Sequence, residues 1–275
     1  MKIDVVTIFP EIIEQSTQCG VLGQALNQNI LSIHAHQLRN YSVDAHRKVD
    51  DRPFGGGDGM VMNAEVIFQA IKNLKLDNTH VIYMSPQGKP LNDQRVRELS
   101  EKKHLVVLCG RYGGVDQRIM PFIDEEISVG DYVVSGGEFP ALILIDAVSR
   151  MIPGVLGHQD SKDIDSFSNG RLEAPHYTRP QLWREFDVPE VLMSGHHLRI
   201  QEWRDLMGWL VTIQKRPDLI KDQLKVLKSE EIKKLKKQIL QLFNSLSQKE
   251  IELNLFDEKL NERIEELFAS KNGEC

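Results

Sequence analysis

The first 150 residues alternate short apolar runs with helical patterns, and this alternation limits the possible folds more than any other feature. The runs Ile3–Ile8, Val81–Met84 and Leu105–Leu108 are rich in β-branched residues, as buried strands are. Between the last two runs a helical pattern extends from Asn92 to about Lys103, and Asn92 is a suitable N-cap. Strands and helices that alternate in this way form a mostly parallel sheet covered by helices, so we expect an α/β fold.

The sequence changes character after about residue 160. The stretch SKDIDSFSNG is polar and has no apolar period, so residues 161–175 are predicted to form a flexible interdomain linker. Strand signals vanish beyond Pro175. A 3-4-3-4 spacing predicts an amphipathic helix that packs on a neighbour, and its apolar positions are Ile232, Leu235, Ile239, Leu242 and Leu246. We therefore expect an α/β domain at 1–160 and a small, mostly helical domain with a helical extension at 176–275.

The composition argues against several classes of protein. The 275 residues carry a formal net charge of −6, whereas proteins that coat nucleic acid without specificity are usually basic. Apolar stretches such as Phe139–Ile145 are far shorter than the roughly 20 residues that span a bilayer, and the N-terminus resembles a strand rather than a signal peptide. The three cysteines have neither a CxxC pair nor a histidine at zinc spacing. We expect a cytoplasmic protein without a membrane partner, a disulfide scaffold or a structural zinc.

Three glycine-rich loops take the place of the familiar cofactor signatures. No GxGxxG follows the first predicted strand, and GxxxxGK[ST], GxSxG and HExxH are absent, which argues against dehydrogenases, P-loop NTPases, α/β-hydrolases and zincins. The loops are SPQG (Ser85–Gly88), CGRYGG (Cys109–Gly114) and SVGDYVVSGGEFP (Ser128–Pro140). Each alone is compatible with a tight turn. Together, at the carboxyl ends of parallel strands, they predict a ligand site.

Long, ordered motifs connect the chain to a known family. They are KIDVVTIFPE, VDDRPFGGGDGMVM, GRYGGVDQR, EISVGDYVVSGGE, IDAVSRMIPGVLG, the DSF of Asp165–Phe167, and PHYTRP. Over roughly the first 220 residues the chain resembles the bacterial tRNA (guanine-N1)-methyltransferases TrmD, which are SPOUT methyltransferases. The resemblance implies a parallel sheet with a deep trefoil knot, an obligatory homodimer and a tRNA-binding C-terminal domain. It also implies transfer of a methyl group from S-adenosyl-L-methionine to N1 of the guanine just 3′ of the anticodon, tRNA position 37.

The resemblance assigns two catalytic residues, and elementary chemistry agrees with both assignments. N1 of guanine is a poor nucleophile until its proton leaves, so a nearby carboxylate is a natural base. Negative charge then spreads to O6, where a guanidinium stabilises the transition state. By resemblance, Asp165 is the general base and Arg150 is the charge-stabilising arginine. The residues alone favour other roles: a solvated turn residue for Asp165, and a cap on a helix that begins near Phe139 for Arg150.

The resemblance also places the methyl donor in the three glycine-rich loops. Backbone groups of such loops can recognise an adenine edge, while apolar neighbours such as Val129 and Val134 enclose the ring. Residues 132–134 are also compatible with a buried strand. The positions that match the cofactor-binding residues of the family are Tyr83, Pro86, Gly110, Tyr112, Ser128, Val129, Gly130, Asp131, Tyr132, Val133, Val134, Gly136, Gly137 and Pro140.

The chain departs from the family pattern at two acidic positions. Gly113 stands where the family usually has the Glu of GRYEG, and Glu173 stands where the family more often has Asp. In the family, this Glu has a supporting role near the methyl donor, so Gly113 here puts secondary acid or metal contacts in doubt. The resemblance implies magnesium dependence, so Mg²⁺ is a possible cofactor, but no acidic cluster has a recognisable metal spacing. We therefore assign no metal ligand.

Basic residues and histidines are weaker candidates. The residues considered for phosphate contacts are Arg39, Arg47, Lys48, Arg52, Arg171, Arg179, Arg199 and Arg204. His176, His196 and His197 lack an obvious third metal ligand, so we expect core, capping or RNA-contact roles. Three alternatives remain, namely a SPOUT methyltransferase with another RNA target, a catalytically idle RNA-binding module and a flavodoxin-like nucleotide binder. The DSF motif, the presence of Asp165 and Arg150, and the basic helical C-terminal domain disfavour them.

Overall fold

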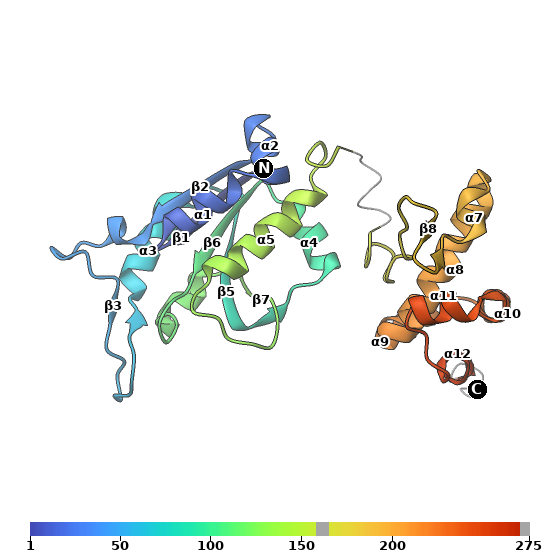
Figure 1. Cartoon of the computed structure of the whole chain (residues 1–275). Helices are drawn as coiled ribbons and strands as arrows, with labels where there is room; N and C mark the ends of the chain where they lie inside the picture. Colours follow the sequence, from blue (N-terminus) through green and yellow to red (C-terminus); the bar gives the residue numbers. More distant parts are fainter. Residues whose placement is uncertain (158–164, 270–275) are drawn as a thin grey trace. The chain divides into compact units, whose positions relative to one another are not determined.

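The computed structural model describes residues 1–157 and 165–269 and divides into two compact units, Met1–Gln159 and Asp160–Cys275. The first unit contains a five-stranded sheet in the order β2-β1-β6-β5-β7, and every neighbouring pair of strands is parallel. The strands are β1 (Lys2–Thr7), β2 (Ser32–Gln37), β5 (Thr79–Pro90), β6 (His104–Cys109) and β7 (Glu125–Ser128). The α/β fold predicted from the alternating pattern is confirmed (Figure 1).

Helices cover both faces of this sheet, which is why its strands have apolar residues at consecutive positions. On β1, Val5 points into the core shared with α1 (Pro10–Thr17), α2 (Gly20–Asn27), α4 (Asp93–Ser100) and α5 (Glu138–Met151). Its neighbour Val6 points to the opposite core, shared with α3 (Ala64–Leu74) and the 3-10 helices η1 (Leu38–Tyr41) and η2 (Gln117–Phe122). All six residues of β6 are buried. The sheet is therefore a rigid support for the loops at its carboxyl edge.

Local sequence signals account for several boundaries in this unit. The Asn92 side chain accepts a hydrogen bond of 2.9 Å from the backbone N–H of Arg95, which confirms the predicted N-cap of α4. A small hairpin joins β3 (Asp50–Asp51) to β4 (Val61–Met62), and it projects from the sheet in Figure 1. Its connection, GGGDG, contains Gly55, Gly56, Gly57 and Gly59 at positive φ, a backbone conformation that side chains disfavour.

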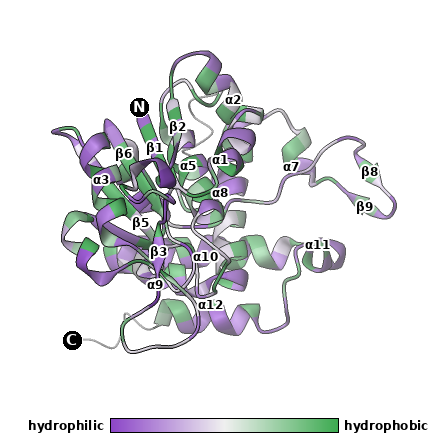
Figure 2. Ribbon diagram, turned by 90° about the vertical axis from the view of Figure 1, so that its left-hand side faces the viewer, coloured by the Kyte–Doolittle hydropathy of each residue, from purple (hydrophilic) through white to green (hydrophobic). Residues whose placement is uncertain are grey.

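The second unit is mostly helical, with one small hairpin. Its helices are α7 (Glu190–Met193), α8 (His197–Lys215), α9 (Pro217–Val226), α10 (Ser229–Ser245), α11 (Gln248–Leu253) and α12 (Leu260–Ala269). α8 forms the centre, with Trp203, Met207, Leu210 and Ile213 buried. The predicted amphipathic helix is confirmed as α10. Figure 2 shows hydrophobic and hydrophilic residues side by side along α10 and α12.

One expectation for this unit is modified, and another lies partly outside the described residues. Strand structure does not vanish after Pro175, because β8 (Leu182–Trp183) pairs with β9 (Phe186–Asp187) in an antiparallel hairpin. Strands of two residues are too short to give a periodic signal. Of the predicted linker, residues 161–164 lie outside the described residues, and residues 165–175 are grouped with the second unit. Within the two described ranges, no helix is long and apolar enough to cross a membrane.

Candidate active site

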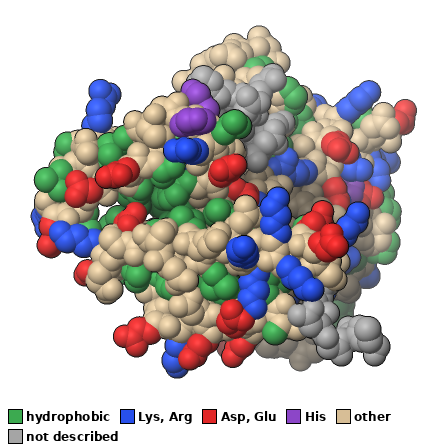
Figure 3. Space-filling view, turned by 90° about the vertical axis from the view of Figure 1, so that its right-hand side faces the viewer, with side chains coloured by type: hydrophobic (Ala, Val, Ile, Leu, Met, Phe, Trp, Pro, Cys, Tyr) green, Lys and Arg blue, Asp and Glu red, His purple; other side chains and the backbone are tan. Residues whose placement is uncertain are grey.

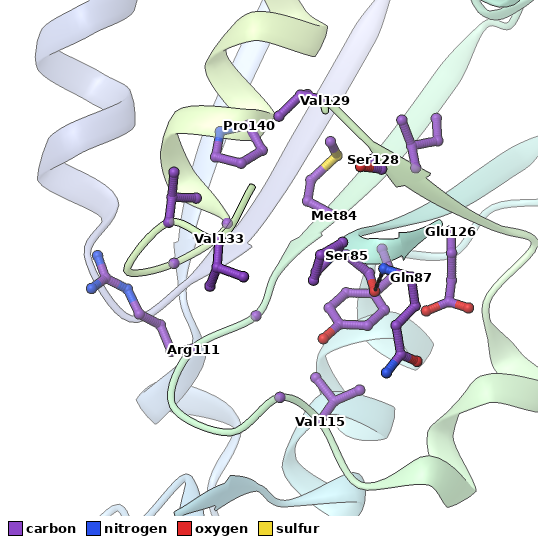
Figure 4. Close-up of a pocket in the computed structure, with 18 of the residues that line it drawn as sticks. Met84, Ser85, Gln87, Arg111, Val115, Glu126, Ser128, Val129, Val133 and Pro140 are labelled. Carbon is purple, nitrogen blue, oxygen red and sulfur yellow. Dashed lines mark hydrogen bonds between the residues drawn. The ribbon is translucent and has the colours of Figure 1, made fainter. Parts of the chain in front are cut away.

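A cavity of about 400 Å³ opens at the carboxyl ends of β5, β6 and β7 (Figure 4). It brings together the three glycine-rich loops, which are far apart in the sequence. Among the predicted cofactor residues, all except Asp131 line it: Tyr83, Pro86, Gly110, Tyr112, Ser128, Val129, Gly130, Tyr132, Val133, Val134, Gly136, Gly137 and Pro140. Parallel sheets commonly bind ligands at this edge. A cavity of this size is within the range of small-molecule sites.

The backbones of the second and third loops hold each other directly. The N–H of Gly137 donates a hydrogen bond of 2.8 Å to the carbonyl of Gly110, and Arg111 forms an antiparallel bridge with Gly136. A Cβ atom on Gly137 would lie 2.7 Å from Cα of Cys109. Glycine is therefore required at position 137 by contact between two loops of the protein itself.

The first loop, Ser85–Gly88, was predicted to be a turn that follows a strand, but in the structure it is part of a strand. Residues 85–88 lie within β5, where they interrupt the pairing with β7: Met84 and Lys89 both align with Ile127. The Ser85 hydroxyl accepts a hydrogen bond of 3.1 Å from the N–H of Gln87 and so stabilises this irregular segment. Bulges that redirect a strand are common next to active sites. Here the bulge places Ser85 and Gln87 on the cavity wall.

The segment from Tyr132 to Val134 is neither a strand nor buried, so the alternative of a buried strand is wrong. The Ser128 hydroxyl donates to the carbonyl of Gly130 at 3.0 Å, and Gly130 has a φ of +149°, which turns the chain away from β7. Val133 is 84% exposed although it is apolar and lines the cavity. The wall of the cavity on this side is thus an open apolar loop.

A buried ion pair connects cavity-lining Arg111 with the first turn of α5. The carboxylate of Glu138 is completely buried, and it accepts hydrogen bonds from the Thr7 hydroxyl at 2.6 Å and from Nε of Arg111 at 3.0 Å. Arg111 also donates to the carbonyl of Ser135 at 3.2 Å, and its guanidinium lies 4.5 Å from the ring centroid of Phe9. One pair of charges therefore connects the ends of β1 and β6 with the first turn of α5.

Glu126 is the only acidic side chain among the described residues that line the cavity. Figure 4 shows it beside Gln87 and across the cavity from Arg111. In residues 1–157 and 165–269, no hydrogen bond or ion pair joins its carboxylate to another side chain, whereas Glu138 neutralises Arg111. Burial and, next, the charge of Glu126 raise the pKa of Tyr83. The cavity therefore has a negative charge without a counterion from the described protein.

The cavity has further lining residues that were not among the individual residues predicted from the sequence. Six of them belong to the predicted loops: Ser85, Gln87, Arg111, Gly113, Gly114 and Ser135. The other six lie outside the loops and were not predicted: Met84, Val115, Gln117, Met120, Glu126 and Ile127. Strand alternation is the signal that could have found Glu126, because neighbouring side chains on a strand point to opposite faces of the sheet. In the structure, Glu125 on β7 pairs with Arg95 and His80, and Glu126 points to the opposite side and lines the cavity. Gly113 also lines the cavity. A Cβ atom there would lie 3.1 Å from the carbonyl oxygen of Met60, so this loop is packed tightly where the family usually has Glu.

The two predicted catalytic residues belong to different units. Arg150 lies in the last turn of α5 and is half-buried. Asp165 begins the described part of the second unit, in a turn whose Ser168 donates to the Asp165 carbonyl through its N–H at 3.2 Å and its hydroxyl at 2.7 Å. Phe167, in the same turn, has a φ of +74°. The cavity is built by the first unit, and the catalytic assignments stay predictions.

The other polar candidates are mostly exposed. The Nε2 atom of His176 lies 2.8 Å from the Glu173 carboxylate, and His196 and His197 begin α8. Among the described residues, no three His, Cys, Asp or Glu side chains are grouped as metal ligands would be. The exposed basic candidates are Arg47, Lys48, Arg52, Arg179, Arg199 and Arg204.

Arg171 was predicted to be a candidate for a phosphate contact, but in the structure its side chain is largely buried and already paired. Its side chain is only 11% exposed and forms an ion pair with Asp205. On the face drawn in Figure 3, Lys and Arg side chains are interspersed with Asp and Glu and do not form one basic field. This face therefore offers individual exposed basic side chains and not a continuous basic patch.

Replacing Gly137 with Ala is expected to lower the thermal unfolding temperature and to weaken ligand binding in the cavity. The added Cβ would overlap the backbone of Cys109, so the two loops must separate. Gly157 provides a matched control because a Cβ there would meet no atom within 4 Å. Differential scanning fluorimetry and calorimetry of both variants test this, and a Gly137→Ala protein with unchanged melting and affinity would contradict the packing described above.

Comparisons with known proteins agree with these features. The family model described as tRNA (Guanine-1)-methyltransferase TrmD matches residues 1–222. A protein of Syntrophomonas wolfei named tRNA (guanine-N(1)-)-methyltransferase is 48% identical over 240 residues, which cover 87% of this chain and 97% of that relative. A protein of the same name from Desulforamulus reducens is 43% identical over 256 residues, covering 91% of this chain and 100% of that relative. The chain belongs to the TrmD family of tRNA (guanine-1)-methyltransferases.

Proposed function

We propose that this protein methylates tRNA at N1 of the guanine just 3′ of the anticodon, with S-adenosyl-L-methionine as methyl donor. The observation that carries the proposal is the family match over residues 1–222, which contains the whole three-loop cavity and both Arg150 and Asp165. The test is incubation of the protein with tRNA and radiolabelled donor, followed by nucleoside analysis. Label in 1-methylguanosine supports the proposal, and label in another nucleoside or in none overturns it.

The cavity fits this donor in both size and charge. Its walls offer backbone N–H and C=O groups of the three loops, which can bind an adenine edge, and apolar side chains such as Val129 and Val134. The donor has a net positive charge, because its sulfonium and ammonium groups outweigh its carboxylate. The unneutralised carboxylate of Glu126 complements that charge. The product S-adenosylhomocysteine has lost the sulfonium charge and gains less from this carboxylate.

Replacing Glu126 with Gln is expected to weaken binding of S-adenosyl-L-methionine roughly tenfold and binding of S-adenosylhomocysteine less than about threefold. The difference arises because one charge pair in a partly solvated cavity contributes on the order of 1–2 kcal/mol. Isothermal titration with both ligands measures it. Glu101→Gln is a control, because Glu101 is exposed and does not line the cavity. Equal losses for the two ligands would show that Glu126 does not sense the sulfonium charge.

The reaction requires a base and a group that stabilises the developing negative charge. S-adenosyl-L-methionine, when bound, supplies an electrophilic methyl group. The Asp165 carboxylate accepts the proton from N1 of guanine, which makes N1 nucleophilic. The Arg150 guanidinium stabilises the negative charge that develops on O6. The cavity loops orient the donor and exclude water from it. For Mg²⁺ the described residues offer no cluster of three or more His, Cys, Asp or Glu side chains.

A homodimer is part of the proposal. α5 presents Phe139, Ile143, Asp146 and Arg150 at 4-3-4 spacing, so these side chains share one face. Phe139 and Ile143 are 55% and 48% exposed, and exposed apolar side chains at such spacing favour association. The two catalytic residues can then come from different subunits. We also propose a deep trefoil knot in the first unit, as part of the dimer surface. Sedimentation of an active monomer would overturn the dimer and this role of the knot.

We propose that the second unit is the tRNA-binding domain, with residues 161–175 connecting it to the methyltransferase domain at 1–160. Its exposed arginines Arg179, Arg199 and Arg204 support this role, since phosphate contacts fix the register of a protein on its nucleic acid. α10, α11 and α12 begin beyond the last residue matched by the family model. They complete the core around α8 by burying Ile239, among others.

A further inference from the structure

We propose that Arg171 is a positioning residue that fixes the turn carrying Asp165 against α8. This inference rests on the proposed function, in which Asp165 is the base. It concerns an arginine that neither the family motifs nor the cavity assigns a role. A base in an exposed turn must be held within hydrogen-bond reach of its proton, and a misplacement of about 1 Å can cost about 10²-fold in rate.

The Arg171 side chain is clamped between two residues of α8. Nη2 donates a hydrogen bond of 2.7 Å to Oδ1 of Asp205, and the guanidinium carbon lies 4.5 Å from the ring centroid of Trp209. Nη1 is buried and has no hydrogen-bond partner among the described residues. Asp205 and Trp209 are one helical turn apart, so the planar guanidinium contacts both at once. The clamp thus depends on the shape of arginine as well as on its charge.

The backbone of Arg171 closes the turn that begins at Asp165. Its carbonyl accepts a hydrogen bond of 2.6 Å from the N–H of Phe167, and the Phe167 carbonyl accepts one of 2.9 Å from Gly170. Ser168 donates to the carbonyl of Asp165 through both its N–H and its hydroxyl. Two sets of hydrogen bonds, linked by the peptide bond between Phe167 and Ser168, therefore hold the backbone from Asp165 to Arg171.

The residues that follow Arg171 fasten the same turn to α8 a second time. The N–H of Leu172 donates a hydrogen bond of 3.0 Å to the Thr212 hydroxyl, and this hydroxyl in turn donates a hydrogen bond to the carbonyl of Gly208. A Cβ atom on Gly208 would lie 3.0 Å from the carbonyl oxygen of Leu172, so the two backbones are in close contact. The N–H of Glu173 reaches back to the hydroxyl of Ser166 at 3.2 Å. The turn is thus seated on α8, and Arg171 is its side-chain anchor.

An alternative role for Arg171 is contact with a tRNA phosphate, and the two roles predict different behaviour. A phosphate contact adds to tRNA affinity and to its salt dependence whatever residue stands at position 165. A positioning residue affects the chemical step, and its effect disappears once the base that it positions is removed. A double-mutant cycle between Arg171 and Asp165 therefore separates the two roles.

The experiment measures single-turnover methyl transfer with saturating tRNA and donor. Arg171→Met, which keeps an unbranched apolar stem over Trp209, is expected to lower the rate about 10–100-fold in the wild-type background and less than about twofold in the Asp165→Asn background. Asp205→Asn is expected to cause a smaller loss, about three- to tenfold, that also vanishes in Asp165→Asn. Arg216→Met is the matched control, because Arg216 pairs with Asp218 in the same unit but both side chains are well exposed. It should leave the rate unchanged.

Affinity measurements complete the test. Arg171→Met should change the dissociation constants of donor and tRNA less than about threefold and leave the salt dependence of tRNA binding unchanged. Losses of equal size in both backgrounds, or full activity in folded Arg171→Met and Asp205→Asn proteins, would overturn the inference. A weaker tRNA complex with a smaller salt slope would assign Arg171 to phosphate instead. If the wild-type protein methylated no tRNA, the proposed function would fail, and hydrogen exchange at the Phe167 and Gly170 amides would still test the clamp: unchanged exchange in Arg171→Met would refute it.

Discussion

An Asp165→Asn protein is expected to carry out single-turnover methyl transfer about 10²–10⁴ times more slowly than the wild type, because a positioned general base contributes about that factor. Asparagine has the size of aspartate and still forms hydrogen bonds, but its amide does not accept a proton at neutral pH. The turn around residue 165 is held by backbone groups, by Ser168 and by the anchor Arg171, none of which the substitution replaces, so it should persist in the variant. Affinity for donor and tRNA should therefore change little.

The pH dependence identifies the lost step. The wild-type rate should rise with pH until the base is ionised or N1 itself begins to lose its proton, whereas the variant should keep only the second dependence. Asp187→Asn, at an exposed aspartate of the same unit, serves as the control and should behave like wild type. If Asp165→Asn retained more than about a third of the wild-type rate, the proton would have to leave to another group or to water, and the mechanism would be wrong.

A Glu138→Gln protein is expected to lose about 3–5 kcal/mol of unfolding free energy, the usual cost of removing one partner from a buried ion pair. Glutamine fits the same space, but it leaves the guanidinium of Arg111 without its counterion in a region that water reaches poorly. The loss should extend to function, because this pair holds Arg111, which lines the cavity and binds the carbonyl of Ser135 in the third loop. Donor affinity should therefore fall together with stability.

Urea unfolding of Glu138→Gln and of the control Glu98→Gln tests this expectation. Glu98 also pairs with an arginine, Arg95, but on the surface of α4, where an ion pair contributes little. The control should unfold at the wild-type urea concentration. Wild-type stability in Glu138→Gln would mean that loop packing, rather than the ion pair, holds the cavity together.

The sequence predicted those parts of the fold that depend on local patterns. The apolar run Val81–Met84 indicated the centre of β5, and Asn92 indicated the start of α4. The extension of β5 through residues 85–88 escaped prediction, because Pro and Gly there suggest a turn and the compensating bulge is set by the neighbouring β7. The hairpin of β8 and β9 escaped it because each strand has two residues.

The candidate site was predictable in its loops but not in its electrostatics. Glycine-rich loops after predicted strands pointed to the cavity, whereas the roles of Arg150 and Asp165 came only from family resemblance. No local pattern pairs Thr7 with Glu138, which is 131 residues away. No local pattern reveals that Arg171 is largely buried and paired with Asp205 of α8, and is therefore not free to contact a phosphate. Such contacts depend on which elements the fold brings together.

Two tRNA transcripts that differ only in the nucleotide just 3′ of the anticodon provide the decisive comparison for the proposed methyl transfer. Both are incubated with the protein and radiolabelled S-adenosyl-L-methionine. The transcript with guanine at this position should gain one methyl group, recovered as 1-methylguanosine, and the transcript with adenine should gain none. Equal labelling of both transcripts, or no labelling of the first, would contradict it.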